Sequence, residues 1–368
     1  MTVKKIFFIF TFLLIATLAF SDTEHSEEAQ SDTHTKSAFE PGKFIFDHIM
    51  DSHDWHLVTI GEEHISIPLP VIVYSRLQGK LHVFMSSKFH HGHEAYNGLV
   101  LVDNKILEAD DHGQPIADAA SPLDFSITKN VLALFVSIAI LLILFISLAK
   151  QYRKRPLEAP QNIQSWLEPV ILFIRDDIAK PAIGEQKYQK FMPFLLTVFF
   201  FIFVNNLLGL IPIFPGGANV TGNIAITMVL ALFTFVITII NANLAYWKHI
   251  VNAPGVPWWI KIPIPLMPVV ELVGMFTKPF VLMVRLFANI SAGHIIVLGF
   301  FSLIFIFGNM SIGAGYGISV VSVGFAVFMS LLELLVAFIQ AYVFTLLSAI
   351  YFGLATEEHH HKEHEPIH

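Results

Sequence analysis

The chain contains no cysteine in its 368 residues, which excludes disulfides, thiol catalysis and cysteine-ligated metal sites. Charged residues are also scarce: they form 14% of the chain, against about 25% in an ordinary soluble domain. A phosphate loop of the form G-x-x-x-x-G-K-S/T is absent, so no nucleotide site of that kind is predicted. Hydrophobic residues instead make up 54% of the chain, and 35 residues are phenylalanine. With a mean hydropathy of +0.64, this is the composition of an integral membrane protein.

The charges that are present divide the chain into two parts. Between Ser21 and Ser121 there are 17 acidic and 6 basic residues, a balance of −11, together with 11 of the 18 histidines. The remainder of the chain carries +4. This split indicates an acidic part in one aqueous compartment and a mildly basic part elsewhere. Neither part supports a role in nucleic-acid binding, which needs a strongly basic surface.

The first 21 residues have the pattern of a secretory signal peptide. Two lysines precede about fifteen mostly apolar residues, a run shorter than the roughly 20 residues that a membrane span needs. We predict cleavage near Ala19 to Ser21, with an uncleaved membrane anchor as the alternative. A signal peptide would place the residues that follow it outside the cytoplasm.

Residues 22–125 are predicted to form an acidic, histidine-rich extracytoplasmic region. Its first part, SDTEHSEEAQSDTHTKS, has the composition of a disordered segment. From Phe44 to Leu107, alternating apolar stretches separated by turn residues predict a small β-rich element. Two motifs, DSHDWH and FHHGH, contain possible metal ligands. Because clustered histidines on polar loops are more often solvated, we predict neither a metal site nor a cofactor.

Apolar runs dominate residues 126–355, the predicted membrane domain. The candidate spans are Val131–Leu148, Pro193–Ile211, Asn223–Trp247, Pro265–Phe307 and Ile318–Leu354. The basic cluster KQYRKRP follows the first span and marks its cytoplasmic end, in agreement with the signal peptide. A His- and Glu-rich tail, residues 356–368, would then be cytoplasmic. The predicted fold is an all-α polytopic membrane protein with about five transmembrane helices, preceded by a small N-terminal region with β structure.

The last two apolar runs are too long for ordinary spans. They cover about 43 and 37 residues, or roughly 64 and 55 Å as helices, whereas the hydrocarbon core is about 30 Å thick. Only the glycine-rich stretch GNMSIGAGYG separates them. We therefore predict a helical hairpin that lies steeply tilted in the membrane, with its turn in that stretch.

Ionisable residues on the first helix of this hairpin need an explanation, because an arginine at the centre of a span costs about 2.5–3.5 kcal/mol. Glu271, Lys278 and Arg285 are seven residues apart and lie near one helix face. Asn289, one turn beyond Arg285, shares that face. His294 is nine positions from Arg285 and points in the opposite direction.

The second helix carries Glu333 and Gln340, which share a face because they are also seven residues apart. Counted from a turn near Gly315, Glu333 and His294 reach similar depths, so the two could meet. Such residues can simply be hydrogen-bonded pairs that hold two helices together, an interpretation that we favour for Asn289. For the ionisable residues, an ion pathway is the better explanation.

Three segments of the sequence resemble subunit a of the F-type ATP synthase. They are PVVELVGMFTKPFVLMVRLFANISAGHII, LLELLVAFIQAYVFTLLSAIYF and, more weakly, NNLLGLIP. The combination RLFxNxxAGH followed by ExxxxxxQAYxFxxL is highly specific, and with the spacing of the spans the resemblance covers about Val131 to Leu354. The resemblance implies a non-catalytic, proton-translocating stator subunit in a bacterial inner membrane.

The resemblance also implies roles for individual residues. Arg285 is expected to be the essential arginine that faces the ring of c subunits, with Gln340 near it and Asn289 in the same motif. His294, Glu333 and Asn206 are assigned to a half-channel that is open to the outside. Glu271 is assigned to a half-channel that is open to the cytoplasm. Gly209 departs from the family, in which this position is often acidic.

The expected partners are the c-ring, the peripheral-stalk subunit b and other subunits of the synthase, besides membrane lipid and protons. Two other classes of protein remain as alternatives. An ion-coupled secondary transporter would need two related halves with broken helices, and the sequence shows no internal repeat. A stand-alone cation channel would usually line its pore with symmetry-related copies of one segment. The resemblance does not identify the role of the acidic N-terminal extension.

Overall fold

The structure is a computed structural model that describes residues 40–60, 63–92, 94–110, 112–116, 119–154, 159–161, 163–211, 214–251 and 266–357. The predicted signal peptide, the predicted disordered segment and most of the C-terminal tail lie outside these residues. The chain divides into two compact units. The first unit comprises Met1–Ile140, Val204–Asn223 and Asn289–Leu335. The second comprises Leu141–Phe203, Ile224–Ala288 and Val336–His368.

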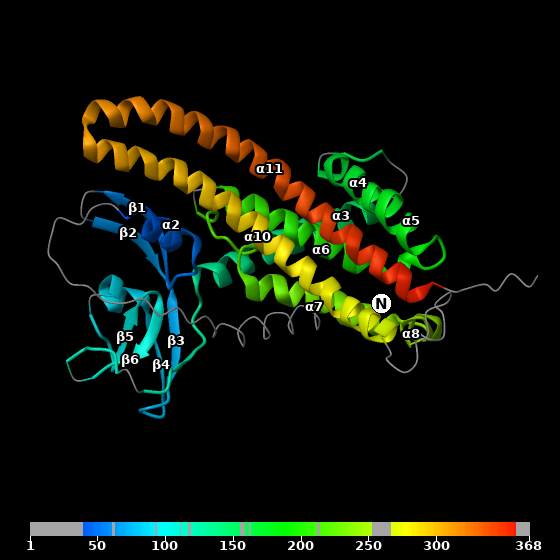
Figure 1. Ribbon diagram of the computed structural model, residues 1–368, viewed down its shortest axis with the longest axis horizontal. Coiled ribbons are helices and arrows are strands. Elements are labelled where there is room, and N and C mark those ends of the chain that lie inside the picture. Colours follow the sequence, from blue (N-terminus) through cyan, green and yellow to red (C-terminus); the bar gives the residue numbers. More distant parts are fainter. Residues whose placement is uncertain are drawn as a thin grey trace, which may run out of the picture. The chain divides into compact units, whose positions relative to one another are not determined.

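Among the described residues, five helices are long and apolar enough to cross a membrane. They are α3 (Lys129–Lys154), α6 (Tyr188–Leu210), α7 (Ile224–Asn241), α10 (Leu266–Met310) and α11 (Ile312–Thr356) (Figure 1). The five spans predicted from the sequence are thereby confirmed. The third is shorter than predicted, because α7 ends at Asn241 and a separate helix, α8 (Leu244–Val251), follows it.

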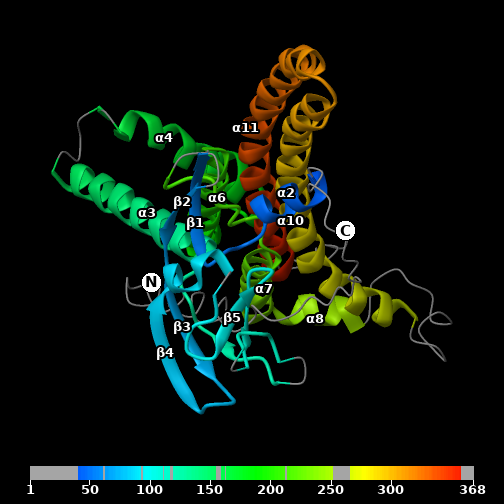
Figure 2. The same cartoon turned by 90° about the vertical axis from the view of Figure 1, so that its left-hand side faces the viewer.

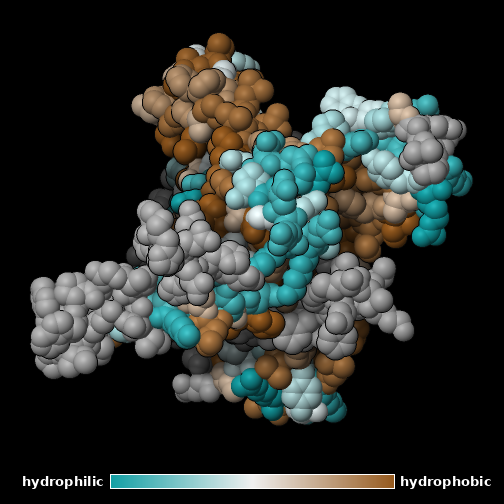
Figure 3. Space-filling model, turned by 90° about the vertical axis from the view of Figure 1, so that its right-hand side faces the viewer, coloured by the Kyte–Doolittle hydropathy of each residue, from teal (hydrophilic) through white to brown (hydrophobic). Residues whose placement is uncertain are grey.

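The long hairpin is present, and each of its helices has 45 residues. Helices of that length extend about 68 Å, so they can remain in a hydrocarbon core of about 30 Å only if they run obliquely. Helices α10 and α11 run side by side from their shared turn in both ribbon views (Figures 1 and 2). In Figure 3 the surface of this hairpin, at the upper left, is predominantly hydrophobic.

The turn of the hairpin is tighter than the glycine-rich stretch predicts. Only Ser311 separates the two helices. Its hydroxyl accepts a hydrogen bond from the Ala314 amide at 3.1 Å, the interaction of a helix N-cap. A Cβ atom on Gly315 would lie 2.8 Å from the Cα atom of Gly308. The glycines therefore permit the two helices to approach closely, rather than forming an extended turn.

The first element in the described part of the N-terminal region is helix α2 (Pro41–Ile49), so the prediction that β structure starts at Phe44 was wrong. Pro41 occupies the first turn of this helix, where its missing N–H is tolerated. The strands form three small antiparallel sheets, ordered β1–β2, β4–β3–β7 and β5–β6 (Figure 2). Their bounds are β1 Asp54–Ile60, β2 Glu63–Pro68, β3 Pro70–Ser75, β4 Lys80–Met85, β5 Leu99–Val102, β6 Lys105–Glu108 and β7 Leu123–Asp124.

The core of this region lies between β3 and the β5–β6 hairpin. Val71 and Val73 are fully buried there against Leu99, Leu101 and Ile106. The 3₁₀ turn η1 (Ser86–Gly92) adds another fully buried side chain from its aromatic residue, Phe89. The alternation of buried residues along β3 is the period-two pattern of a strand with one face in a core.

Asp51 joins the N-terminal region to the first membrane helix. Its carboxylate accepts hydrogen bonds from the Asn130 amide at 3.0 Å and from the Thr128 hydroxyl at 2.7 Å, both at the start of α3. Burial raises the pKa of Asp51, although these two hydrogen bonds and the charge of Lys129 act in the opposite direction. The carboxylate thus satisfies one N–H group of the first helical turn, that of Asn130, which would otherwise lack a partner.

The cytoplasm-facing segment predicted between α3 and α6 is largely helical. It contains α4 (Ile163–Phe173), a π-helical turn η2 (Ile174–Ala179) and the short helix α5 (Lys180–Ile183). Asp176 lies in this π-helical turn and forms salt bridges of 2.8 Å with Arg175 and 2.7 Å with Lys180. The hydrogen bonds and charges of these two partners hold the pKa of Asp176 well below its usual range.

Candidate functional site

The structure brings His294 of α10 and Glu333 of α11 together. His294 Nδ1 lies 4.0 Å from Glu333 Oε1, and both side chains are largely buried. Gly293 provides the room for this approach, because a Cβ atom at that position would collide with the Glu333 carboxylate. An imidazole and a carboxyl group therefore lie close together between two apolar helices. These are the side chains best suited to proton exchange near neutral pH.

Polar groups from α6 and the loop after it surround the same region. The Thr221 hydroxyl donates a 2.5 Å hydrogen bond to Asn206 Oδ1, and both residues are buried. A Cβ atom at Gly209 would lie 3.7 Å from His294 Nε2, so the position that is often acidic in the resembled family faces this histidine. In the described part of the chain, buried side-chain atoms of Asn219 and Ser291 have no protein partner. Buried polar atoms of this kind are usually satisfied by water.

Arg285 is exposed on α10, whereas Leu282 and Leu286 beside it are each 1% exposed. Asn289 is exposed as well, as expected for a residue one turn further along the same face. Within the described ranges, Arg285 forms no salt bridge with an acidic residue of its own chain. The charge of Arg285 is therefore presented to the surroundings of the chain.

Gln340 of α11 is 5% exposed. The described residues show no hydrogen bond between Gln340 and Arg285. Their expected proximity rests on the family resemblance alone.

A second cluster of titratable residues lies in the other unit. A cavity of about 160 Å³ is lined by Glu271 and Lys278 of α10 and by Tyr246 and His249 of α8. Burial and then the neighbouring Glu271 carboxylate raise the pKa of Tyr246. The cavity has room for several water molecules, because each takes about 30 Å³ in the liquid. The cluster has the residues and the space for a hydrated path.

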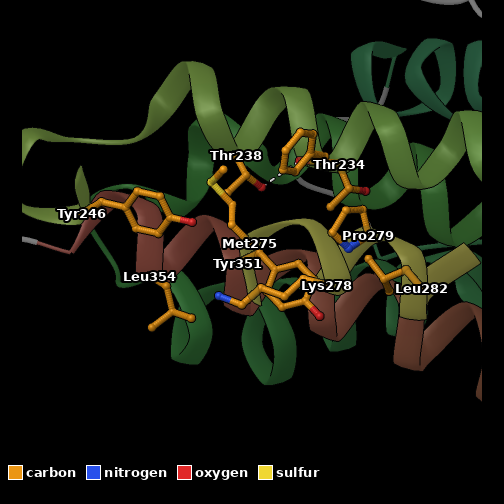
Figure 4. Close-up of a pocket in the computed structure, with 10 residues that line it drawn as sticks. Thr234, Thr238, Tyr246, Met275, Lys278, Pro279, Leu282, Tyr351 and Leu354 are labelled. Atoms are coloured by element: carbon orange, nitrogen blue, oxygen red, sulfur yellow. Dashed lines mark hydrogen bonds between the residues drawn. The ribbon is translucent and has the colours of Figure 1, made fainter. Parts of the chain in front are cut away.

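A narrower pocket of about 10 Å³ adjoins this cavity (Figure 4). Lys278 and Tyr351 lie next to each other there, with the lysine Nζ 5.6 Å from the centre of the tyrosine ring. Among the described residues, Lys278 forms no salt bridge with Glu271. Glu271 keeps its carboxylate at the cavity instead.

Tyr246 and His249 were not predicted from the sequence. They reach the cavity because α7 ends early and Asn243 then starts α8, with its side chain accepting a 2.8 Å hydrogen bond from the Tyr246 amide. The Asn243 amide in turn donates a 2.9 Å hydrogen bond to the Ala355 carbonyl at the end of α11. Asn243 is a local sequence signal for the start of α8. Its partner in α11 is more than a hundred residues away, so the position of α8 at the cavity could not be predicted from the local sequence.

The two histidine motifs of the N-terminal region have separate environments. His53, from DSHDWH, is buried, and its Nε2 atom lies 2.7 Å from Asp124 Oδ2. Burial alone would raise the pKa of Asp124, but the hydrogen bond and charge of His53 outweigh it and lower the pKa. His90, from FHHGH, is exposed and lies 3.6 Å from Glu94. The described residues contain no group of three or more His, Asp or Glu arranged to hold a metal ion.

Residues 131–353 match the family model described as ATP synthase A chain. The chain belongs to this family. It is 44% identical over 255 residues to ATP synthase subunit a of Chloroherpeton thalassium, covering 67% of this chain and 72% of that protein. Identity is 41% over 287 residues to the Pelodictyon phaeoclathratiforme subunit a, covering 75% and 80%. It is 43% over 263 residues to that of Myxococcus xanthus, covering 69% and 81%.

As a member of the ATP synthase A chain family, the protein is a multi-pass membrane subunit of an ATP synthase complex. It is the proton-translocating stator of the membrane sector and is not itself catalytic. Family membership excludes the two alternatives, a secondary transporter and a stand-alone channel. Residues 44–125 match a separate domain of unknown function (DUF8433), which coincides with the β-containing N-terminal region.

Proposed function

We propose that Arg285 faces the c-ring and separates two half-channels for protons. The observation that carries this proposal is that an exposed arginine in an apolar helix has no acidic partner within the described part of its own chain. An arginine there needs an external counter-charge, and a carboxyl group on a rotor helix supplies one. The fixed positive charge favours ionisation of that carboxyl group, so the proton leaves beside Arg285.

His294 and Glu333 form the centre of the proposed outer half-channel, with Asn206 near its mouth. Their 4.0 Å approach and the unpartnered polar atoms of Asn219 support a hydrated route between buried groups. Thr221 fixes Asn206 through its hydrogen bond. Protons would enter here and be transferred to the ring.

Glu271 belongs to the proposed cytoplasmic half-channel. The cavity that it shares with Lys278, Tyr246 and His249 supports this assignment. An ionised carboxylate attracts cations and retains water, and the lysine keeps the local net charge near zero. Asn289, which is exposed, is proposed to line the contact with the ring beside Arg285, and the buried Gln340 to lie near Arg285. Each proton that crosses 100 mV releases about 2.3 kcal/mol, which the ring converts into rotation.

The proposed topology places the N-terminal region outside a bacterial inner membrane and the C-terminus in the cytoplasm. The basic residues Arg153 and Lys154 in the last turn of α3 support it, since positive residues accumulate at cytoplasmic ends. We also propose that residues 1–21 are a cleaved signal peptide, that residues 22–125 are extracytoplasmic, and that residues 126–355 form the membrane domain with a cytoplasmic tail at 356–368. Subunit b is the proposed partner in the peripheral stalk.

Replacement of Arg285 tests the central proposal. Arg285→Ala and Arg285→Lys should both abolish ATP-driven proton pumping in inverted vesicles, because a buried lysine can lose its proton whereas arginine stays charged. Co-purification with a small two-helix proteolipid should be retained. Arg153→Ala, at an exposed arginine outside the hairpin, serves as the matched control and should pump normally. Substantial pumping by Arg285→Ala would refute the assignment.

A further inference from the structure

The sheet β4–β3–β7 carries an apolar face that nothing in the described part of the chain covers. Its exposed residues are Tyr74 on β3, Leu81, Val83 and Met85 on β4, and Phe125 just after β7. Val83, at the centre of β4, is 66% exposed. These residues lie on one face because Tyr74 pairs with Leu81 and successive outward residues alternate along each strand.

The opposite face of the same strands is the core face. Val71 and Val73 alternate with the exposed positions and are fully buried towards the β5–β6 hairpin, which lies on one side of β3 and β4 in both ribbon views (Figures 1 and 2). The exposed face therefore has an apolar side chain at each paired position of β3 and β4, whereas the core face also carries Ser75 and His82. A half-exposed antiparallel sheet normally alternates apolar and polar residues, so the outer face departs from the pattern of a solvated sheet.

The charge around this face differs from that of the rest of the region. Residues 64–93 contain no Asp or Glu but include Arg76, Lys80 and Lys88, within an N-terminal region that carries −11 overall. All three basic residues are exposed. The β3–β4 hairpin and the turn after it thus form the one positively charged segment of an acidic region. Lys80 pairs with Ser75 and Lys88 lies over the Tyr96 ring, so these two lysines belong to the opposite side of the sheet, and Arg76 is in the turn between β3 and β4. An apolar face on a segment without carboxylates can approach an anionic lipid surface without charge repulsion.

The apolar face is also continuous with the first membrane helix. Phe125 lies four residues before Lys129, where α3 begins. Hydrogen bonds fix this short connection to the sheet: the Phe125 amide donates to the Ile72 carbonyl at 2.8 Å, and the Ile127 amide to the Pro70 carbonyl at 3.0 Å. Asp51 fixes the start of α3 from the other side. One edge of the face is therefore held within about a helical turn of the membrane surface.

We propose that this face docks on the headgroup and upper acyl region of the membrane in which α3 is embedded. The exposed apolar residues enter the interface, Arg76 in the hairpin turn contacts anionic headgroups, and the acidic remainder of the region stays in water. The proposal requires only that α3 crosses the membrane. It does not depend on the role of Arg285 or on which side of the membrane the N-terminal region lies. The N-terminal region is then a membrane-surface module rather than a freely moving domain.

The absence of cysteine allows a direct test in the assembled synthase. Val83→Cys and, as a second position on the same face, Leu81→Cys are labelled with an environment-sensitive fluorophore. Lys105→Cys, on the exposed turn of the β5–β6 hairpin, is the matched control. The labelled complexes are reconstituted in vesicles of phosphatidylcholine and phosphatidylglycerol, with or without brominated acyl chains. Quenching by the brominated lipid reports contact with lipid, and quenching by iodide reports contact with water.

Labels at 81 and 83 should be quenched by brominated lipid and protected from iodide, whereas the label at 105 should show the reverse. Protection of 81 and 83 from iodide without quenching by brominated lipid would mean that protein covers the face, either another subunit or a second copy, and would refute lipid docking. Equal quenching by iodide at all three positions would refute any docking. Loss of pumping by Arg285→Ala has no bearing on either result, so the two proposals fail separately.

Discussion

Gly293 controls the distance between His294 and Glu333, and its replacement by alanine tests the proposed outer half-channel. A Cβ atom at this position would collide with Glu333 Oε1 and lie 3.0 Å from both Cγ and Cδ of the same side chain. Glu333 must then rotate away or α10 and α11 must separate. Either change increases a separation from His294 that is already 4.0 Å.

The expected effect on stability is small, whereas the effect on proton flow is large. Gly→Ala within a helix normally stabilises by about 1 kcal/mol, and overpacking costs about 1–3 kcal/mol, so the net loss should be about 0–2 kcal/mol. The complex should therefore assemble. If misplacement of Glu333 raises the barrier to proton transfer by about 1.4 kcal/mol, the rate falls about tenfold. We expect ATP-driven pumping in inverted vesicles to fall by about that factor.

Gly324→Ala is the matched control, because the same substitution on α11 meets nothing within 4 Å. It should assemble and pump like the unmodified protein. Gly293→Asp would be uninformative, since it adds a charge, so alanine is the sharper probe. Normal pumping by Gly293→Ala, or an equal loss in both variants, would show that the close approach of His294 and Glu333 does not limit proton flow.

Three further predictions concern access and stability. A cysteine at 271 should react with a water-soluble thiol reagent only from the cytoplasmic side and one at 294 only from the outside; reaction of both from one side would exclude two half-channels. Asp51→Ala leaves buried donors at Asn130 and Thr128 without their acceptor and should destabilise by about 1–3 kcal/mol, seen as a lower Tm of the solubilised complex, with Asp51→Asn less affected. The pKa of Asp124 is lower in the folded protein than in the unfolded chain. Ionised Asp124 therefore stabilises the fold fully above the ordinary pKa of a carboxyl group, and this stabilisation is lost as the pH falls through the pKa of the folded state. The difference in stability between the unmodified protein and Asp124→Asn, followed by acid-dependent fluorescence of Trp55, should therefore shrink as the pH falls, and a constant difference would contradict the sign.

The sequence predicted the spans because their signal is local: long apolar runs with few charges identify membrane helices from composition alone. The meeting of His294 and Glu333 also followed from counting along an antiparallel hairpin. The count assumed a turn near Gly315, whereas the turn is at Ser311, 17 residues after His294 and 22 before Glu333. The pair meets despite this asymmetry, and Gly293 leaves the room that the Glu333 carboxylate occupies beside His294.

The parts that could not be predicted depend on contacts between distant residues. Nothing local distinguishes Tyr246 and His249 from interfacial residues at the end of a span. Their place at the Glu271 cavity follows from the bond between Asn243 and the Ala355 carbonyl. In the N-terminal region, the apolar residues of Phe44–Ile49 fit a helix as well as a strand, and Pro41 at the helix start was the signal that favoured α2.

The two cations of α10 differ in their surroundings, and this difference supports the proposal that Arg285, rather than Lys278, faces the ring. Lys278 is partly buried, with its ammonium group beside the ring of Tyr351 and at the same cavity as Glu271. Arg285 lies seven residues later and is exposed; its charge also acts on Tyr351, but it forms no salt bridge in the described ranges. Because arginine stays charged at every accessible pH, the proposed arrangement would give a rotor carboxylate a permanent counter-charge at Arg285, between the positions of Glu271 and His294 on α10.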